Sequence, residues 1–180
     1  MNKMNERVSL YSSSLYSASC EENCVKEVYD SLKMVEKLMK DNSEYVSIAS
    51  SANLSVEERE KLIDSAFSGN VHSLCLNFMK ILAKKRIFNI LVPCIEEYEK
   101  QYLKDNNITH ASITTAFALS EERKEQIVAK LGKSTGKTII PEFVVREDIV
   151  GGIIIETENS SIDASIIGKL ESIERYLSKN

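Results

Sequence analysis

The segment whose residue types most resemble a ligand-binding motif is rich in glycine and lysine. It reads Gly132-Lys133-Ser134-Thr135-Gly136-Lys137-Thr138. Two glycines followed by a lysine and a hydroxyl residue are the components of a loop that binds phosphate. That loop needs four residues between its glycines, whereas only three separate Gly132 from Gly136. It also joins a strand to a helix, whereas the pattern here indicates a helix followed by a strand. We therefore interpret the segment as a solvated helix-to-strand loop rather than a nucleotide site.

Another candidate site combines cysteines with a histidine. Cys20 and Cys24 are four residues apart and His72 and Cys75 are three apart, so each pair could face one way on its own helix. Three thiolates and one imidazole form a ligand set that zinc accepts in tetrahedral geometry. Small thiols are also common fillers of helical cores. We favour buried thiols over a metal site or disulfides, and the pattern assigns no function to Cys20, Cys24, Cys75 or Cys94.

No arrangement of residues indicates a hydrolase. The chain lacks a Gly-x-Ser-x-Gly segment, and its histidines, His72 and His110, fall in a densely apolar helix and in a predicted strand. Its charged pairs and runs fit helix ends and solvated faces, as in Glu57-Glu58, Glu96-Glu97, Glu121-Glu122 and Lys84-Lys85-Arg86. We therefore predict no catalytic residue and no cofactor.

The composition is that of a globular protein of one large or two small domains. The 180 residues are 43% hydrophobic and 28% charged, and 23 basic against 27 acidic residues give a net charge of −4. This balance argues against nucleic acid as a partner. The first 14 residues lack the apolar run of a signal peptide, and charged residues interrupt the apolar segment 71–92. We predict neither export nor direct membrane insertion.

Helical periodicity dominates the first part of the chain. Apolar residues recur every three or four positions between about Glu21 and Lys40, which predicts one amphipathic helix there. Ser55 and Glu58 have the spacing of a capping box, which opens a helix that stops near Gly69. The segment 74–83 is so apolar that we expect a central helix, and Pro93 marks the start of the next one.

The pattern changes after about residue 105. A β-branched run predicts a strand over 108–119, and Ser120 can cap a helix that Gly132 ends. Two further runs predict strands over 138–145 and 152–157, and Asp163 can cap a final helix. The predicted fold class is α+β, with an N-terminal six-helix bundle over 1–105 and a small C-terminal α/β subdomain over 106–180.

Segments from three parts of the chain together resemble one known family. The C-terminal part contains Ile149-Val150-Gly151-Gly152-Ile153-Ile154-Ile155, then Ile162-Asp163-Ala164-Ser165 and Ile167-Gly168-Lys169-Leu170-Glu171. The N-terminal part contains Leu10-Tyr11-Ser12-Ser13-Ser14-Leu15-Tyr16, and the central part contains Phe78-Met79-Lys80-Ile81-Leu82-Ala83 followed by Leu91-Val92-Pro93. In order and spacing they resemble the delta-subunit family of F-type ATP synthases, whose mitochondrial members are the oligomycin-sensitivity-conferring proteins.

The C-terminal signature has a physical interpretation. Gly151 and Gly152 allow close packing at a strand start, Asp163 caps the last helix, and Gly168 gives that helix a point of close approach. The chain departs from the family where Ala164 replaces a glycine and where serines replace alanines near Tyr11. The four cysteines belong to no family pattern.

The resemblance implies a non-catalytic stator subunit of a bacterial, proton-translocating F-type ATP synthase. One copy per complex would link the alpha subunits of the catalytic head to the b subunits of the peripheral stalk, on the cytoplasmic side of the cell membrane, so that rotation is coupled to ATP synthesis. In this family the helical domain binds alpha-subunit N-terminal helices in a groove between its first and fifth helices. The resemblance carries partner binding onto Tyr11, Ser14, Leu15, Phe78 and Leu82.

Other functions remain open at this stage. A helical-bundle regulatory adaptor that binds RNA or another protein is the main alternative, and the net charge of −4 disfavours its RNA form. A nucleotide-binding enzyme would depend on the misspaced glycine segment near Gly132. Binding of an alpha-subunit peptide would distinguish the stator function from both.

Overall fold

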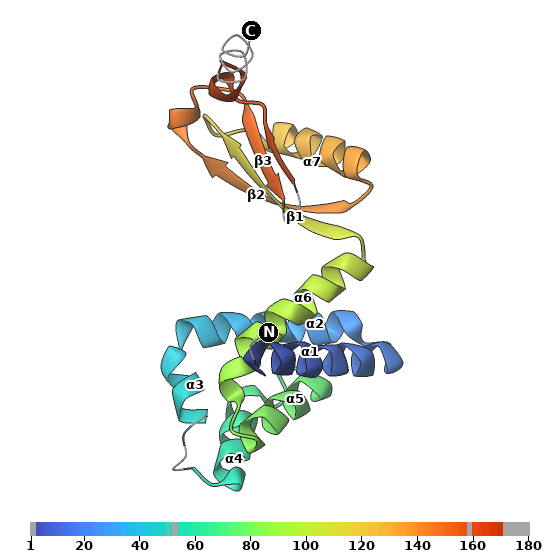
Figure 1. Cartoon of the computed structure of the whole chain (residues 1–180), viewed down its shortest axis with the longest axis vertical. Helices are drawn as coiled ribbons and strands as arrows, with labels where there is room; N and C mark the ends of the chain where they lie inside the picture. The colour runs from blue at the N-terminus through green and yellow to red at the C-terminus, as the bar shows by residue number, and fades with distance from the viewer. Residues whose placement is uncertain (1–2, 50, 52–53, 158–159, 171–180) are drawn as a thin grey trace. The chain divides into compact units, whose positions relative to one another are not determined.

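The computed structural model describes residues 3–49, 51, 54–157 and 160–170. The chain separates into two compact units, Met1–Tyr102 and Leu103–Asn180. Helices come first along the chain (Figure 1): α1 (Lys3–Glu21), α2 (Val25–Asp41), α3 (Ser43–Ala49), α4 (Val56–Phe67), α5 (Ser73–Lys84), the short η1 (Phe88–Ile90) and α6 (Leu91–Asp105). A small sheet follows, with β1 (Ile108–Thr115), α7 (Glu121–Thr135), β2 (Thr138–Val145), η2 (Glu147–Ile149), β3 (Ile153–Thr157), β4 (Ser160–Asp163) and a helix that begins at residue 166. The predicted α+β class is confirmed.

The amphipathic stripe of α2 is buried as its spacing predicts. Val28, Leu32 and Val35 are at most 1% exposed because these positions share one face of the helix. The helix begins later than predicted, since α1 continues to Glu21 and a turn separates the two helices. Asn23 adopts φ +55 in this turn, a left-handed conformation that asparagine tolerates better than most residues.

The predicted capping box opens α4. The Ser55 hydroxyl accepts a hydrogen bond from the Glu58 N–H at 3.2 Å, and the Glu58 carboxylate accepts one from the Ser55 N–H at 2.7 Å. The next helix, α5, lies at the centre of the unit, as its apolar content predicts. Its residues Cys75, Met79 and Leu82 are fully buried.

Tyr98 of α6 joins three helices inside the first unit. Its ring is fully buried and lies edge-on to Tyr16 of α1, with 5.1 Å between ring centroids. Its hydroxyl lies 2.8 Å from the Ser19 hydroxyl and donates to the Val25 carbonyl at 3.1 Å. A buried tyrosine needs such partners for its hydroxyl, so α1, α2 and α6 are held in one arrangement.

Ion pairs also connect α2 to α6. Lys33 of α2 donates to Glu36 at 2.6 Å and to Glu99 of α6 at 3.1 Å, and Lys40 donates to Glu36 at 2.7 Å. Glu36 is buried, so its carboxylate depends on these two ammonium groups. Burial acts to raise the pKa of Glu36, but the hydrogen bonds and charges of Lys33 and Lys40 outweigh it and lower the pKa below its ordinary value.

We expect Glu36→Gln to lower the free energy of unfolding by about 1–2 kcal/mol at neutral pH, because glutamine offers one neutral acceptor oxygen in place of the two anionic oxygens that accept from Lys33 and Lys40. The folded state lowers the pKa of Glu36, so this stabilisation is complete above the ordinary value of 4.5 and is lost as pH falls below it. Denaturant unfolding followed by circular dichroism at several pH values measures the effect. If the native protein and Glu36→Gln differed in free energy of unfolding by the same amount down to strongly acidic pH, the stabilising role of the Glu36 carboxylate would be contradicted.

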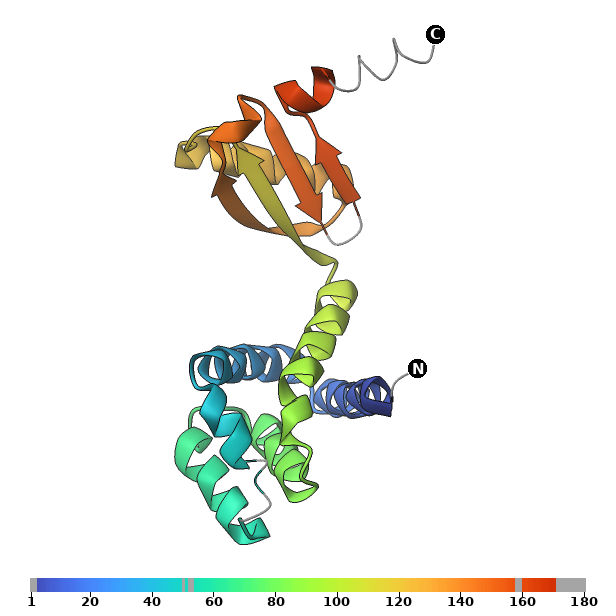
Figure 2. The same ribbon diagram turned by 60° about the vertical axis from the view of Figure 1, so that its left-hand side comes forward.

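The second unit is a sheet with a helix on one of its faces. The strand order is β2-β1-β3-β4, with β1 parallel to β2 and the other neighbours antiparallel. In both views α7 lies along one face of this sheet (Figure 1, Figure 2). Ala111, Ile113 and Ile139 form the core beneath it, together with the α7 residues Ile127, Val128 and Leu131.

Several sequence predictions for this unit are wrong in detail. Gly132 does not end α7, which continues to Thr135 and is capped by Gly136 at φ +67. The first strand ends at Thr115 rather than at residue 119. Strand β4 was not predicted, because its four residues are all exposed and carry no apolar alternation. It forms because it pairs with β3.

The signature residues meet where β3, β4 and the last helix join. The Ile166 N–H donates to the Gly151 carbonyl at 3.0 Å. Gly152 adopts φ +87, and a Cβ atom there would collide with the Ala164 carbonyl and lie 2.7 Å from the Ser165 Cα. A Cβ atom on Gly168 would collide with the Asp163 carboxylate. Backbone atoms leave no room for a side chain at Gly152, whereas the contact at Gly168 is with the end of the Asp163 side chain, which can move aside.

The predicted role of Asp163 as the helix cap is wrong. Asp163 ends β4, and its carboxylate accepts the N–H of Ser165 at 2.9 Å. The Ser165 hydroxyl in turn accepts the Gly168 N–H at 2.9 Å, which makes Ser165 the cap of the helix that begins at residue 166. Ala164 does not adopt a positive φ, so alanine in place of glycine causes no left-handed strain there.

Candidate docking groove

A groove of about 390 Å³ lies between α1 and α5. Two stripes of residues face it, one from each helix. The lining residues are Leu10, Tyr11, Ser14, Leu15 and Ala18 of α1, and Leu74, Asn77, Phe78, Ile81 and Lys85 at and after α5. Spacings of three, four and seven place each stripe on one face of its helix. The groove therefore follows from the periodicity of both helices and from their packing side by side.

The resemblance assigned five residues to partner binding, and the structure brings four of them together here. Tyr11, Ser14, Leu15 and Phe78 all line the groove. Leu82 does not, because it is fully buried behind the groove and has no surface to offer a partner. Leu82 belongs instead to the buried core of the first unit, together with Leu15 and Phe78.

The groove has a buried floor and an exposed rim. Leu15 and Phe78 are each only 6% exposed and form the floor, whereas Leu10 and Ile81 are 63% and 46% exposed. The Ser14 hydroxyl donates to the Leu10 carbonyl at 2.7 Å, so this serine already satisfies its polar group within its own helix. The serine-rich α1 therefore still presents a mainly apolar surface to the groove.

Several lining residues were missed by the sequence reasoning. Leu74, Ile81 and Lys85 share the face of α5 that carries Phe78, and helical spacing from Phe78 could have identified them. The sequence indicates that Lys85 belongs to a solvated helix end, and Lys85 is indeed exposed at the end of α5. In the structure its ammonium lies over the ring of Tyr11, 5.3 Å from the ring centroid.

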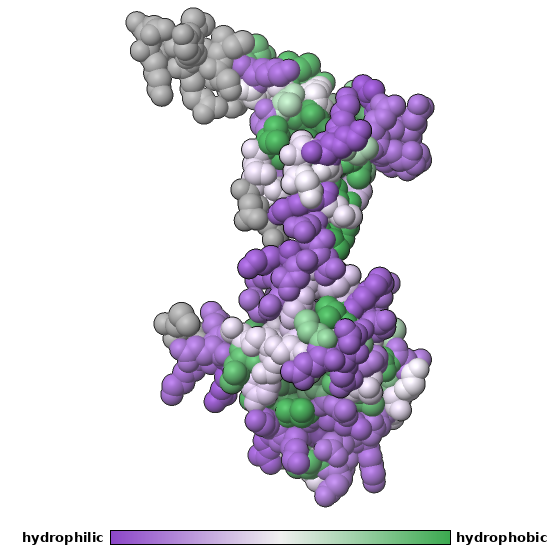
Figure 3. All heavy atoms as spheres, turned by 90° about the vertical axis from the view of Figure 1, so that its right-hand side faces the viewer, coloured by the Kyte–Doolittle hydropathy of each residue, from purple (hydrophilic) through white to green (hydrophobic). Residues whose placement is uncertain are grey.

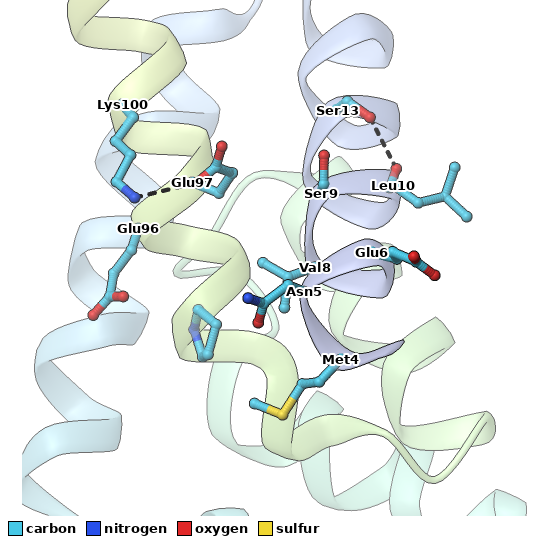
Figure 4. A pocket seen from close by; sticks show the side chains of 11 residues that line it. Met4, Asn5, Glu6, Val8, Ser9, Leu10, Ser13, Glu96, Glu97 and Lys100 are labelled. Carbon is cyan, nitrogen blue, oxygen red and sulfur yellow. Dashed lines mark hydrogen bonds and ion pairs between the residues drawn. The ribbon is translucent and has the colours of Figure 1, made fainter. Parts of the chain in front are cut away.

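Another groove lies on the opposite side of α1, against α6 (Figure 4). It is larger, about 780 Å³, but its lining is more polar and includes the charged side chains of Glu6, Glu96, Glu97 and Lys100. Glu97 pairs with Lys100 at 3.3 Å, and Leu10 points away from α6 in this view. Its polar lining makes it a poorer surface than the α1–α5 groove for an apolar helix face.

Hydrophobic side chains also reach the surface of the second unit, between hydrophilic ones (Figure 3). Among the described residues of this unit, the most exposed large hydrophobic side chains are those of Phe117 at 66%, Val150 at 68% and Leu170 at 62%. Val150 also adopts φ +61, which is unfavourable for a β-branched residue. In the described part of the chain, no helix is long and apolar enough to cross a membrane.

A comparison with protein families identifies the relationship. Residues 8–177 match the model described as the ATP synthase delta (OSCP) subunit. The chain belongs to the ATP synthase delta (OSCP) subunit family. It is thus a non-catalytic subunit of an F-type ATP synthase, as the resemblance implied.

Relatives named as delta subunits are similar in sequence to this delta-family chain over almost its whole length. It is 29% identical over 168 residues to "ATP synthase subunit delta" of Leuconostoc mesenteroides, covering 93% of each chain. It is 27% identical over 169 residues to the protein of the same name from Clostridium botulinum, strain Loch Maree, covering 94% of each. Among solved structures, a chain of the Toxoplasma gondii mitochondrial ATP synthase hexamer has the same fold, with a TM-score of 0.72, 16% identity and coverage of 94% and 96%.

The cysteines of this delta-family member do not form the zinc set considered above. Cys75 and Cys94 are at most 1% exposed, and burial raises the pKa of both thiols to about 12. Cys24 is also buried, whereas Cys20 is exposed, so the prediction of buried thiols is wrong for Cys20. His72 caps α5, and its Nδ1 accepts the Leu74 N–H at 3.3 Å. No group of three such ligands is arranged for a metal among the residues that the structure describes.

The glycine-lysine segment is structural as well. Gly132 to Thr135 form the last turn of α7, Gly136 caps it, and β2 begins at Thr138. The predicted order of helix before strand is confirmed, although most of the predicted loop is helical. The Gly136 N–H is used within the turn, where it donates to the Gly132 carbonyl at 2.9 Å.

Proposed function

We propose that this delta-family subunit is the stator link of a bacterial, proton-translocating F-type ATP synthase. Helices α1 to α6 act as a six-helix bundle that binds the N-terminal helices of the alpha subunits on the catalytic head. The unit Leu103–Asn180 binds the b subunits of the peripheral stalk. The observation that carries the proposal is the apolar α1–α5 groove, where four residues expected to bind a partner lie together.

The form of the groove supports a helical ligand. An amphipathic helix buries apolar side chains at positions i, i+3, i+4 and i+7 when it lies in a groove between two other helices. The floor residues Leu15 and Phe78 and the rim residues Leu10 and Ile81 provide apolar surface along such a path. We therefore assign partner contact to Tyr11, Ser14, Leu15 and Phe78 and extend it to Leu10 and Ile81.

The second unit supplies the surface for the stalk in this proposal. Phe117, Val150 and Leu170 expose large apolar side chains that a partner would cover. The φ of +61 at Val150 is a strained conformation, and such strain is retained most often at functional sites. A subunit that resists torque needs firm, largely apolar attachment at each end and no active site.

The cellular assignment follows from these partners. The subunit is peripheral, lies on the cytoplasmic side of the cell membrane and is present once per complex in this proposal. It reaches the membrane through the b subunits, in keeping with the absence of a membrane-spanning helix from the described residues. Neither nucleic acid nor a cofactor takes part.

Calorimetric titration of the full-length chain with a synthetic peptide tests the head-binding function. The peptide is the alpha-subunit N-terminus of the same organism, and a scrambled peptide of the same composition is the control. We expect saturable binding of the native peptide alone, with the negative heat-capacity change of apolar burial. No binding of that peptide, together with salt-sensitive binding of RNA, would favour the adaptor function instead.

A further inference from the structure

We infer that Lys85, positioned by Tyr11 at one end of the α1–α5 groove, recognises a carboxylate on the bound helix. The groove would then select a helix that carries Asp or Glu at the matching position. This inference rests on the proposed function, because it specifies the helix that the groove accepts. The juxtaposition that carries it is the Lys85 ammonium above the Tyr11 ring, 5.3 Å from the ring centroid.

The backbone holds Lys85 at this end of the groove. Lys85 is the C-cap residue of α5, and its N–H donates to the Ile81 carbonyl at 3.1 Å. Its aliphatic stem therefore starts from a fixed point beside the exposed rim residue Ile81. The electron-rich face of Tyr11 attracts the ammonium toward the groove, and Lys85 stays exposed to water there until a ligand covers it.

Lys85 brings a positive charge to a groove that is otherwise lined by uncharged side chains among the described residues. Some lysines elsewhere in this unit have acidic partners, such as Lys33 with Glu36 and Lys80 with Asp64. No carboxylate within 3–49, 51, 54–157 and 160–170 is within ion-pair distance of Lys85.

The charge of Lys85 makes the two ends of the groove chemically different. Ala18 lies seven residues beyond Tyr11 on α1, and Leu74 lies eleven residues before Lys85. These separations correspond to about 10 Å and about 16 Å along the helix axes. Because Lys85 at the end of α5 lies over Tyr11, which precedes Ala18 on α1, the two helices run in opposite directions along the groove, and the end lined by Ala18 and Leu74 is apolar. A bound helix therefore meets a cation at one end and hydrocarbon at the other.

A docked helix removes water from the Lys85 ammonium, and this imposes a requirement on the ligand. An ammonium that loses water without a new acceptor destabilises the complex, whereas a carboxylate in its place forms a charge-assisted hydrogen bond. We propose that the ligand is an amphipathic helix with a central apolar stripe and an Asp or Glu one turn beyond it, at the Lys85 end. The carboxylate fixes both the direction and the register of the bound helix.

The test compares Lys85→Met with Lys84→Met in the full-length protein. Lys84 is the matched control, since it is the preceding residue, is exposed and does not line the groove. Methionine keeps the length and apolar stem of lysine but removes the charge. We expect Lys85→Met to weaken binding of the alpha-subunit N-terminal peptide about tenfold, and Lys84→Met to change it by less than about twofold.

Peptide variants identify the partner carboxylate. Each Asp and Glu of the peptide is replaced in turn by Asn or Gln, and each variant is titrated against the native protein and Lys85→Met. We expect one replacement to weaken binding to the native protein about tenfold and to have little further effect on Lys85→Met. Added salt should reduce the affinity of the native pair more than that of the Lys85→Met pair.

The outcomes separate this inference from the proposed function. Equal affinities of Lys85→Met and Lys84→Met for a peptide that binds the native protein would overturn the inference alone. So would the absence of any peptide carboxylate coupled to Lys85. If the native protein does not bind the peptide at all, the proposed function fails and the inference fails with it.

Discussion

Replacing Ile81 by Glu should weaken binding of the alpha-subunit N-terminal peptide by at least about 100-fold. Ile81 lies on the rim of the α1–α5 groove and is 46% exposed, so a docked helix would bury it further. A carboxylate at this position would lose its water inside an apolar groove. It would also stand four residues before Lys85, where it can pair with that ammonium and occupy it. Titration of the full-length variant measures the loss.

The fold should survive this change, because the side chain is substantially exposed and an i,i+4 ion pair favours the helix. Ile48→Glu is the matched control. Ile48 is 49% exposed on α3 and lies outside the α1–α5 groove, so the same substitution there should leave peptide affinity within about twofold. Equal affinities of Ile81→Glu and the native protein would exclude this groove as the docking site.

Replacing Gly152 by Ala should destabilise the unit Leu103–Asn180 by about 3 kcal/mol or more. Gly152 adopts φ +87, which costs energy for any residue with a Cβ atom. That atom would also collide with the Ala164 carbonyl and crowd the Ser165 backbone. Relief requires β3 to separate from the segment that leads into the last helix, and that movement disrupts the Ala164 N–H to Ile153 carbonyl bond of 2.9 Å.

Gly136→Ala separates the two causes of this loss. Gly136 also has positive φ, at +67, but nothing lies within 4 Å of a Cβ atom built there. Replacing Gly136 by alanine should therefore lower the free energy of unfolding by only about 1 kcal/mol, from the unfavourable positive φ alone. Hydrogen exchange read by mass spectrometry on the full-length proteins reports each unit separately. Equal loss of protection in the two variants would show that the predicted collision is absent.

The two units should respond independently to this substitution. Gly152→Ala should leave binding of the alpha-subunit peptide unchanged, since the groove belongs to Met1–Tyr102. Recovery of the b subunits with the full-length variant should fall, because the proposed stalk surface depends on the second unit. Loss of peptide binding in Gly152→Ala would contradict this division of functions.

Local patterns predicted the helical part of the fold well. The stripe through Val28, Leu32 and Val35 is buried, and the Ser55–Glu58 capping box forms with both hydrogen bonds. Each of these features depends on residues within two or three turns of one another, so periodicity and capping chemistry are sufficient to predict it.

Predictions failed where a distant segment decides the outcome. Both Gly132 and Gly136 could end α7, and the helix continues to the second because β2 starts only at Thr138, whose N–H donates to the Asn107 carbonyl at 2.8 Å. Strand β4 has no apolar alternation and exists through its pairing with β3. Asp163 ends this strand for the same reason, which leaves Ser165 to cap the following helix.

The sequence by itself determined the α+β class, the order of the elements other than β4, and the family, because these depend on periodicity along the chain and on motifs with set spacing. Only the tertiary structure decided which helix faces meet. Phe78 and Leu82 are one turn apart on α5, yet one lines the groove and the other lies wholly behind it. Likewise, no spacing along the chain places Lys85 over Tyr11. Periodicity defines a face relative to its own helix axis, but the neighbour of that face is decided by side-chain packing between helices far apart in sequence.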